Sequence, residues 1–95
     1  MRISFHPEAT AELEASADWY VEHSPAASRS FCVAVDAALA KISATPERFV
    51  HIDARHQACA VQKFPFQIIF RHSGDRVHVV AVAHAKRKPG YWRNR

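Results

Sequence analysis

The chain has 95 residues, of which 48% are hydrophobic and 23% are charged, a composition that is typical of a globular protein and excludes a disordered chain. No apolar run reaches the roughly 20 residues of a membrane-spanning helix, and the N-terminus lacks the pattern of a secretory signal, so we expect a cytoplasmic protein without membrane attachment. The length suits a single domain over residues 1–95, in which the distant Cys32 and Cys59 stay reduced.

The N-terminal quarter predicts a short strand followed by a helix. Residues 2–6 are typical of a strand, and Pro7 suits the first position of a helix because that position needs no N–H donor. The spacing of apolar residues places Ala9, Leu13, Ala17, Tyr20 and Val21 on one face of this helix. The acids are expected on the opposite, solvated face: Glu8, Glu12, Glu14, Asp18 and Glu22. Trp19 lies off the apolar stripe and is expected either to cover the end of a helical hairpin or to stand exposed as an interface anchor.

A second helix is predicted between Ser24-Pro25, a start signal, and Thr45-Pro46, which ends it. One of its faces forms a continuous apolar stripe from Phe31 to Ile42. Another face carries small residues, and we expect it to receive the first helix, with a partner chain as the alternative. The residues of this small face are Val33, Ala37, Ala40 and Ala44.

Three apolar segments, residues 58–63, 65–72 and 76–84, predict strands in the second half of the chain. Ser73-Gly74-Asp75 suits a tight turn between the last two. The final strand is apolar at both its odd- and its even-numbered positions, whose side chains point to opposite faces. This predicts that both faces are covered, one by the helices and the other by the C-terminal tail or a partner segment. The expected fold class is therefore α+β, in which an N-terminal strand and a helical hairpin pack on a mainly antiparallel sheet, in the order β-α-α-β-β-β.

The C-terminal tail, residues 84–95, concentrates the positive charge of the chain. It holds five lysines and arginines, no acid, and the aromatic pair Tyr91 and Trp92. Such a segment suits nucleic acid or an acidic protein surface, although a solvated tail whose aromatics merely cap the core would look the same. Pro89-Gly90 predicts a turn that folds the aromatics back toward the sheet.

The histidines give little support for a metal site. His51, His56, His72 and His78 have no recognised ligand spacing, and no metal or cofactor is expected. His84 ends a predicted strand, where it can serve as a general acid or base or have a purely structural role; the sequence favours the structural role. Neither a nucleophile motif nor a glycine-rich phosphate loop is present.

Several motifs together resemble the RelE/ParE toxin superfamily, whose members are often described as plasmid stabilisation proteins. The segments are FHPEA, TPERF, FPFQIIF and a closing H-x-x-R-x-P-x-x-W pattern at His84, Arg87, Pro89 and Trp92, and the similarity covers nearly the whole chain. This resemblance implies the growth-inhibiting toxin of a type II toxin–antitoxin system. It also implies a cognate antitoxin protein that wraps over the toxin in a hetero-oligomer, with Trp19 as the expected antitoxin-binding residue.

The superfamily divides by target, since RelE-like members cleave messenger RNA on the ribosome whereas ParE-like members block DNA gyrase. Of the RelE positions, Arg87 matches the basic residue after the final strand. The expected lysines fall at Ala58 and Ala60, the arginine at Gln67, and the tyrosine near Arg93. The resemblance therefore favours a ParE-like gyrase inhibitor that is not an enzyme.

Two alternatives remain beside this interpretation. One is a ribosome-dependent mRNA endonuclease, in which His84 is the base, Lys86 and Arg87 bind phosphate, and Tyr91 is the acid; it requires His84, Arg87 and Tyr91 to converge on one patch. The other is a non-toxic module that only binds antitoxin. For either target, the residues expected to bind it are Lys86, Arg87, Lys88, Trp92, Arg93 and Arg95.

Overall fold

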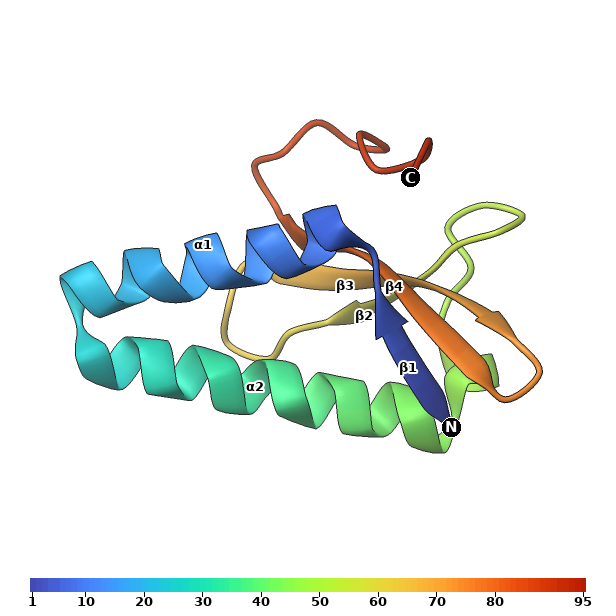
Figure 1. Cartoon of the computed structure of the whole chain (residues 1–95), viewed down its shortest axis with the longest axis horizontal. Helices are drawn as coiled ribbons and strands as arrows, with labels where there is room; N and C mark the ends of the chain where they lie inside the picture. The colour runs from blue at the N-terminus through green and yellow to red at the C-terminus, as the bar shows by residue number, and fades with distance from the viewer.

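The computed structural model describes all residues 1–95 and confirms the α+β class. Figure 1 shows the two helices as a hairpin along one side of the sheet, with the C-terminal tail on another side. No helix is both long enough and apolar enough to cross a bilayer. The elements, in chain order, are β1 (Arg2–Phe5), α1 (Pro7–His23), α2 (Pro25–Ala44), the 3-10 helix η1 (Pro46–Arg48), β2 (Gln57–Ala60), β3 (Phe66–Ser73) and β4 (Arg76–His84).

Both helices begin where the prolines predict. Pro7 follows His6, whose side chain accepts a hydrogen bond from the Glu8 N–H. Pro25 follows Ser24, whose hydroxyl accepts from the Ala27 N–H. These side chains satisfy N–H groups that the first turn of a helix leaves without partners.

The sheet is mixed, in the order β1-β4-β3-β2, with β1 parallel to β4 and the other pairs antiparallel. The predicted hairpin between β3 and β4 is confirmed, and Gly74 supplies the positive φ of +58° that its tight turn uses. A bulge opposite Ile69 and Phe70 inserts Val80 into β4. As a result Val80 and Ala81 both join the cluster on the face away from the helices.

Apolar residues pack on both faces of the central strands, as the composition of β4 predicts. The larger cluster lies between the helices and the sheet and includes Phe31, Ile68 and Phe70. The second lies on the opposite face and consists of Ala58, Ile69, Val80, Ala81 and Trp92. The tail thus covers part of this second face through Trp92.

The expected packing of the small face of α2 is wrong. Val33 is 67% exposed, and Ala37, Ala40 and Ala44 are exposed as well. The helices instead meet through the face that also carries the core stripe: the Tyr20 and Phe31 rings lie 5.2 Å apart, and the Ser28 hydroxyl donates to the Ala17 carbonyl. Val21, expected in the core, is 50% exposed. A sheet pressed against one side of the hairpin leaves these outer positions in solvent.

Candidate functional site

The C-terminal tail folds back over the sheet after β4. Gly90, with φ +78°, provides the turn that Pro89-Gly90 predicts. Trp92 is then only 5% exposed, and its ring lies 4.7 Å from the ring of the buried His56. Because the indole belongs to the second core, it is not free to stack on an unpaired base in this conformation.

Glu12 of α1 holds the end of the tail. Its carboxylate accepts hydrogen bonds from the Tyr91 hydroxyl at 2.7 Å and from both terminal nitrogens of Arg95 at 3.0 Å. The Glu12 and Arg95 side chains are each only 13% exposed. The Arg87 guanidinium lies 3.9 Å from the same carboxylate. The expectation that all five acids of this helix are solvated is therefore wrong at Glu12.

The Glu12–Arg95 pair also completes the edge of β4. The last residue of β1, Phe5, pairs with Val79, so no strand flanks β4 beyond that point. There the Val82 N–H donates to Glu12 Oε1 at 3.0 Å, and Arg95 Nη1 donates to the Val80 carbonyl at 3.1 Å. Two side chains thus satisfy backbone groups that an adjacent strand would otherwise bind.

These contacts fix the protonation of the cluster. Burial acts to raise the pKa of Glu12, but the hydrogen bonds from Arg95, Tyr91 and Val82 together lower it below its ordinary value. Burial and the hydrogen bond to Glu12 raise the pKa of Tyr91, and the bond to Glu12 raises the pKa of Arg95. The tyrosine therefore stays protonated and donates a hydrogen bond to the charged carboxylate.

The lowered pKa of Glu12 makes folding stability depend on pH. The contribution is fully present above the ordinary value of 4.5 and is lost as pH falls below it, because protonation removes the negative charge that strengthens these hydrogen bonds. We expect the thermal unfolding midpoint to decrease as the pH is lowered from 5 to about 3, and to decrease less steeply in Glu12→Gln. Asp53, whose pKa is also lowered, leaves the variant with a residual slope. Identical slopes in the two proteins would contradict this role of Glu12.

His84, Arg87 and Tyr91, the residues of the nuclease alternative, do converge. All three line two cavities, one of about 530 Å³ and one of about 160 Å³, and the Arg87 guanidinium lies 3.9 Å from the centre of the Tyr91 ring. His84 Nδ1 accepts a hydrogen bond from the Lys86 N–H, which leaves Nε2 as its free nitrogen. However, Glu12 lines the smaller of these cavities. A carboxylate that repels phosphate and a tyrosine with a raised pKa are poorly suited to stabilise and protonate a phosphorane.

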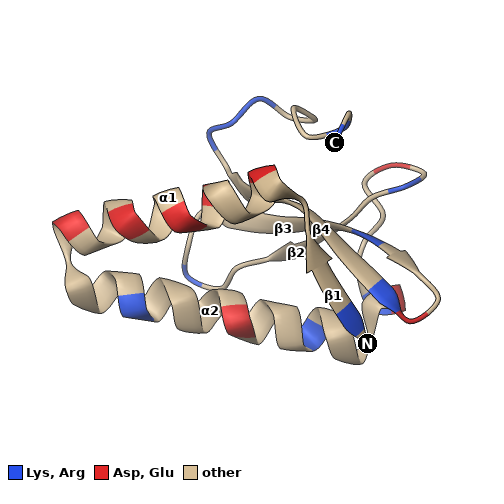
Figure 2. Ribbon diagram, viewed as in Figure 1, with Lys and Arg blue, Asp and Glu red and all other residues tan.

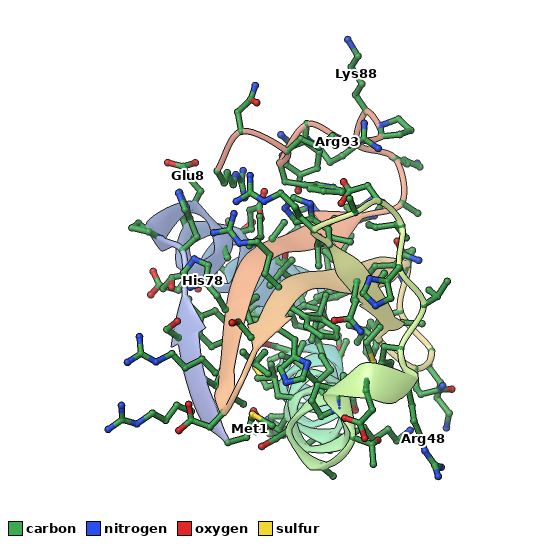
Figure 3. The ribbon with its side chains drawn as sticks, turned by 90° about the vertical axis from the view of Figure 1, so that its right-hand side faces the viewer. Met1, Glu8, Arg48, His78, Lys88 and Arg93 are labelled. Carbon is green, nitrogen blue, oxygen red and sulfur yellow. The ribbon has the colours of Figure 1, made fainter.

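The other residues expected to bind the target divide into exposed and anchored groups. Lys86 and Lys88 are exposed, and Lys88 points away from the body of the protein (Figure 3). Arg93 donates to Asp53 at 3.3 Å, while Arg95 is held by Glu12. Lys86, Arg87 and Lys88 therefore form the accessible cationic segment, here named the basic loop. Figure 2 shows it on the tail, opposite the acids of α1.

Trp19, the expected antitoxin contact, is 54% exposed. Its ring stacks on His23 of the same helix, with the ring centres 3.8 Å apart. It borders a hollow of about 290 Å³ that we name the α1 hollow, lined by Ala15, Ser16, Trp19, Tyr20, Phe66 and His84. The side chain is thus an exposed aromatic beside an apolar depression.

The remaining sequence positions of interest carry no catalytic group. Ala58 lies in the second core with Trp92, while Ala60 and Gln67 are exposed cross-strand partners. Nowhere do three histidine, cysteine, aspartate or glutamate side chains meet as metal ligands would.

A parallel N-terminal strand, a helical hairpin on one face of the sheet and a folded basic tail on the other define a small α+β protein with an accessible cationic segment. The solved structure described as the chromosomal ParDE toxin–antitoxin system from P. aeruginosa shares this fold, with a TM-score of 0.66 and 17% identity over 90% of this chain and 97% of that chain. No curated protein sequence matches.

The family model of the ParE toxin of the type II toxin–antitoxin system parDE matches residues 3–89. The chain belongs to this family and is a ParE-like toxin. Membership implies a cognate antitoxin as its partner. The match ends before Tyr91, Trp92 and Arg95, the residues that attach the tail.

Proposed function

We propose that this toxin acts in the bacterial cytoplasm as an inhibitor of DNA gyrase, and that the basic loop contacts the target. The observation that carries the proposal is the fixed position of this loop. Tyr91 and Arg95 bind Glu12, and Trp92 enters the second core, so Lys86, Arg87 and Lys88 are held on the surface between β4 and the anchored end. A preorganised cationic loop loses little conformational freedom when it binds an acidic surface or a protein–DNA complex.

The Glu12 cluster favours inhibition by binding over RNA cleavage. Cleavage needs a general acid and excess positive charge beside the scissile phosphate. Here the Tyr91 hydroxyl donates its hydrogen bond to Glu12, and the same carboxylate offsets the positive charge of Arg95 and part of that of Arg87. An inhibitor needs only the exposed surface, which this arrangement preserves.

The α1 hollow is the proposed docking site of the antitoxin. It shares Ala15, Ser16, Phe66 and His84 with the cavity of about 160 Å³ that Arg87 and Tyr91 line, so the two depressions adjoin. A segment anchored on Trp19 and running along α1 would reach the basic loop. Neutralisation would then follow from steric and electrostatic cover of the loop, and an antitoxin with acidic residues at this end would match its charge.

Trp19→Ala is expected to weaken antitoxin binding at least 30-fold, because exposed tryptophans at interface centres commonly contribute 2 kcal/mol or more, about a 30-fold change in Kd. Calorimetric titration with the purified antitoxin measures the change. Val33→Ala, which trims an exposed apolar side chain on α2, is the matched control and should change the Kd less than about threefold. Equal Kd values for the wild type and Trp19→Ala would rule out this docking site.

The function is tested by induced expression in a bacterial host, with and without the antitoxin encoded by the neighbouring reading frame. We expect growth arrest that the antitoxin relieves, a reporter plasmid that loses negative supercoils, and intact messages. Cut messages with normal plasmid topology would instead identify the nuclease alternative. A folded protein that causes no arrest at any expression level would identify the non-toxic binding module.

A further inference from the structure

A second positively charged surface lies on the sheet, away from the basic loop. Trp92 covers one end of the sheet face opposite the helices, and the other end forms a cavity of about 420 Å³ lined by nine residues. Ala54 is the single hydrophobic residue among them, and none is acidic. Six are arginines or histidines, which together we name the sheet-end patch: His51, Arg55, Arg71, His72, Arg76 and His78.

The sheet pairing assembles this patch from separate segments. Arg71 of β3 and His78 of β4 are cross-strand partners. Arg76 begins β4 beside Arg2 of β1, which adds a further cation at the same end. The segment before β2 contributes His51 and Arg55, and His51 forms an isolated bridge to Gln57. Figure 2 shows blue segments at this end of the strands, with a red segment at the turn between β3 and β4, and Figure 3 shows His78 on the sheet surface.

The three arginines of the patch, Arg55, Arg71 and Arg76, form no salt bridge with a carboxylate side chain. Asp75 precedes Arg76 in the turn before β4, and Arg71 donates to the main-chain oxygen of Arg95 at 3.1 Å. Asp53, the nearest acid in sequence to Arg55, is already bound to His56 and Arg93. Burial and the neighbouring Arg71 lower the pKa of His78, so the positive charge of the patch comes from its arginines.

We infer that the sheet-end patch binds the phosphate backbone of nucleic acid. Guanidinium groups match phosphate oxygens in geometry as well as charge, and nucleic-acid interfaces are much more basic and polar than protein interfaces. Protein interfaces typically have an apolar core, whereas Ala54 is the single hydrophobic residue of this cavity. The inference does not depend on gyrase as the target, because the patch lies outside the basic loop and the α1 hollow.

The test uses fluorescence anisotropy with two labelled probes, a 20-nucleotide oligothymidine and a 20-base-pair duplex, at low salt and without gyrase. Arg55→Glu/Arg76→Glu reverses two exposed charges of the patch. Arg29→Glu/Lys41→Glu makes the same change in net charge on the exposed surface of α2 and is the matched control. Circular dichroism verifies that both variants are folded.

We expect the patch variant to bind at least tenfold more weakly than the wild type. The slope of the logarithm of the binding constant against the logarithm of the salt concentration should decrease in magnitude by about 1.5, because each phosphate contact contributes about 0.7 to 0.9 to it. The control should stay within about threefold of the wild type. The two probes show whether single strands or duplex are preferred. Equal weakening by both variants, no binding at low salt, or equally tight binding of a labelled polyglutamate peptide would overturn the inference.

Discussion

Glu12→Ala is expected to lower the free energy of unfolding by about 3 kcal/mol, because it leaves a largely buried guanidinium, a tyrosine hydroxyl and a β4 N–H without their acceptor. For a chain of this size, a loss of 1 kcal/mol lowers the thermal midpoint by about 4–8 °C. Urea titration and a thermal scan measure both quantities. Glu14→Ala removes a neighbouring exposed acid of the same helix and should change stability by less than about 0.5 kcal/mol.

The same substitution should loosen the tail before the chain unfolds globally. Trp92 is the natural reporter, because its ring is buried against the sheet, and a Trp19→Phe background removes the second indole. We expect the emission of Trp92 to shift to the red in Glu12→Ala at temperatures where the helices remain intact. An unshifted emission and a midpoint equal to that of the wild type would show that Glu12 does not hold the tail.

Reversing the charge of the basic loop with Lys86→Glu/Lys88→Glu is expected to abolish growth arrest while leaving the thermal midpoint within about 2 °C of the wild type. Both side chains are exposed, so their replacement costs little stability. In the proposed mechanism the loop meets an anionic target surface, and four units of charge reversal there change attraction into repulsion. Colony counts after induction, at protein levels matched by immunoblot, measure the effect.

The control variant Arg29→Glu/Lys41→Glu, also used for the sheet-end patch, should remain toxic. This result would separate a local requirement for the basic loop from an effect of net charge.

Deleting residues 85–95 is a weaker test of the basic loop. The deletion removes Trp92 from the second core and Arg95 from Glu12, so loss of toxicity would follow from unfolding alone. Undiminished growth arrest by Lys86→Glu/Lys88→Glu would exclude the basic loop as the target contact.

The order of helices and strands followed from local signals in the sequence. Pro7 and Ser24-Pro25 mark helix starts through backbone chemistry that is fixed within one turn. Apolar residues at both odd- and even-numbered positions of β4 predicted that both faces are covered. Pro89-Gly90 predicted the turn that brings the tail back over the second face. Each of these inferences depends on residues close together in the chain.

The parts that sequence reasoning missed depend on contacts between distant residues. Glu12 is separated by 79 residues from Tyr91 and by 83 from Arg95, and nothing local distinguishes it from the other acids of α1. Small residues on α2 suit close helix packing equally well on two faces, so the pattern did not reveal which face meets α1. The sheet-end patch is spread over residues 51–78, and only the register of β3 and β4 places Arg71 beside His78.

The supercoiling activity of purified gyrase, titrated with the purified toxin in the presence and absence of antitoxin, tests the central claim most directly. We expect dose-dependent inhibition by the wild type, restored supercoiling when antitoxin is added, and at least tenfold weaker inhibition by Lys86→Glu/Lys88→Glu. Full supercoiling at a large molar excess of folded, growth-inhibiting toxin would contradict inhibition of gyrase and would require another target for the basic loop.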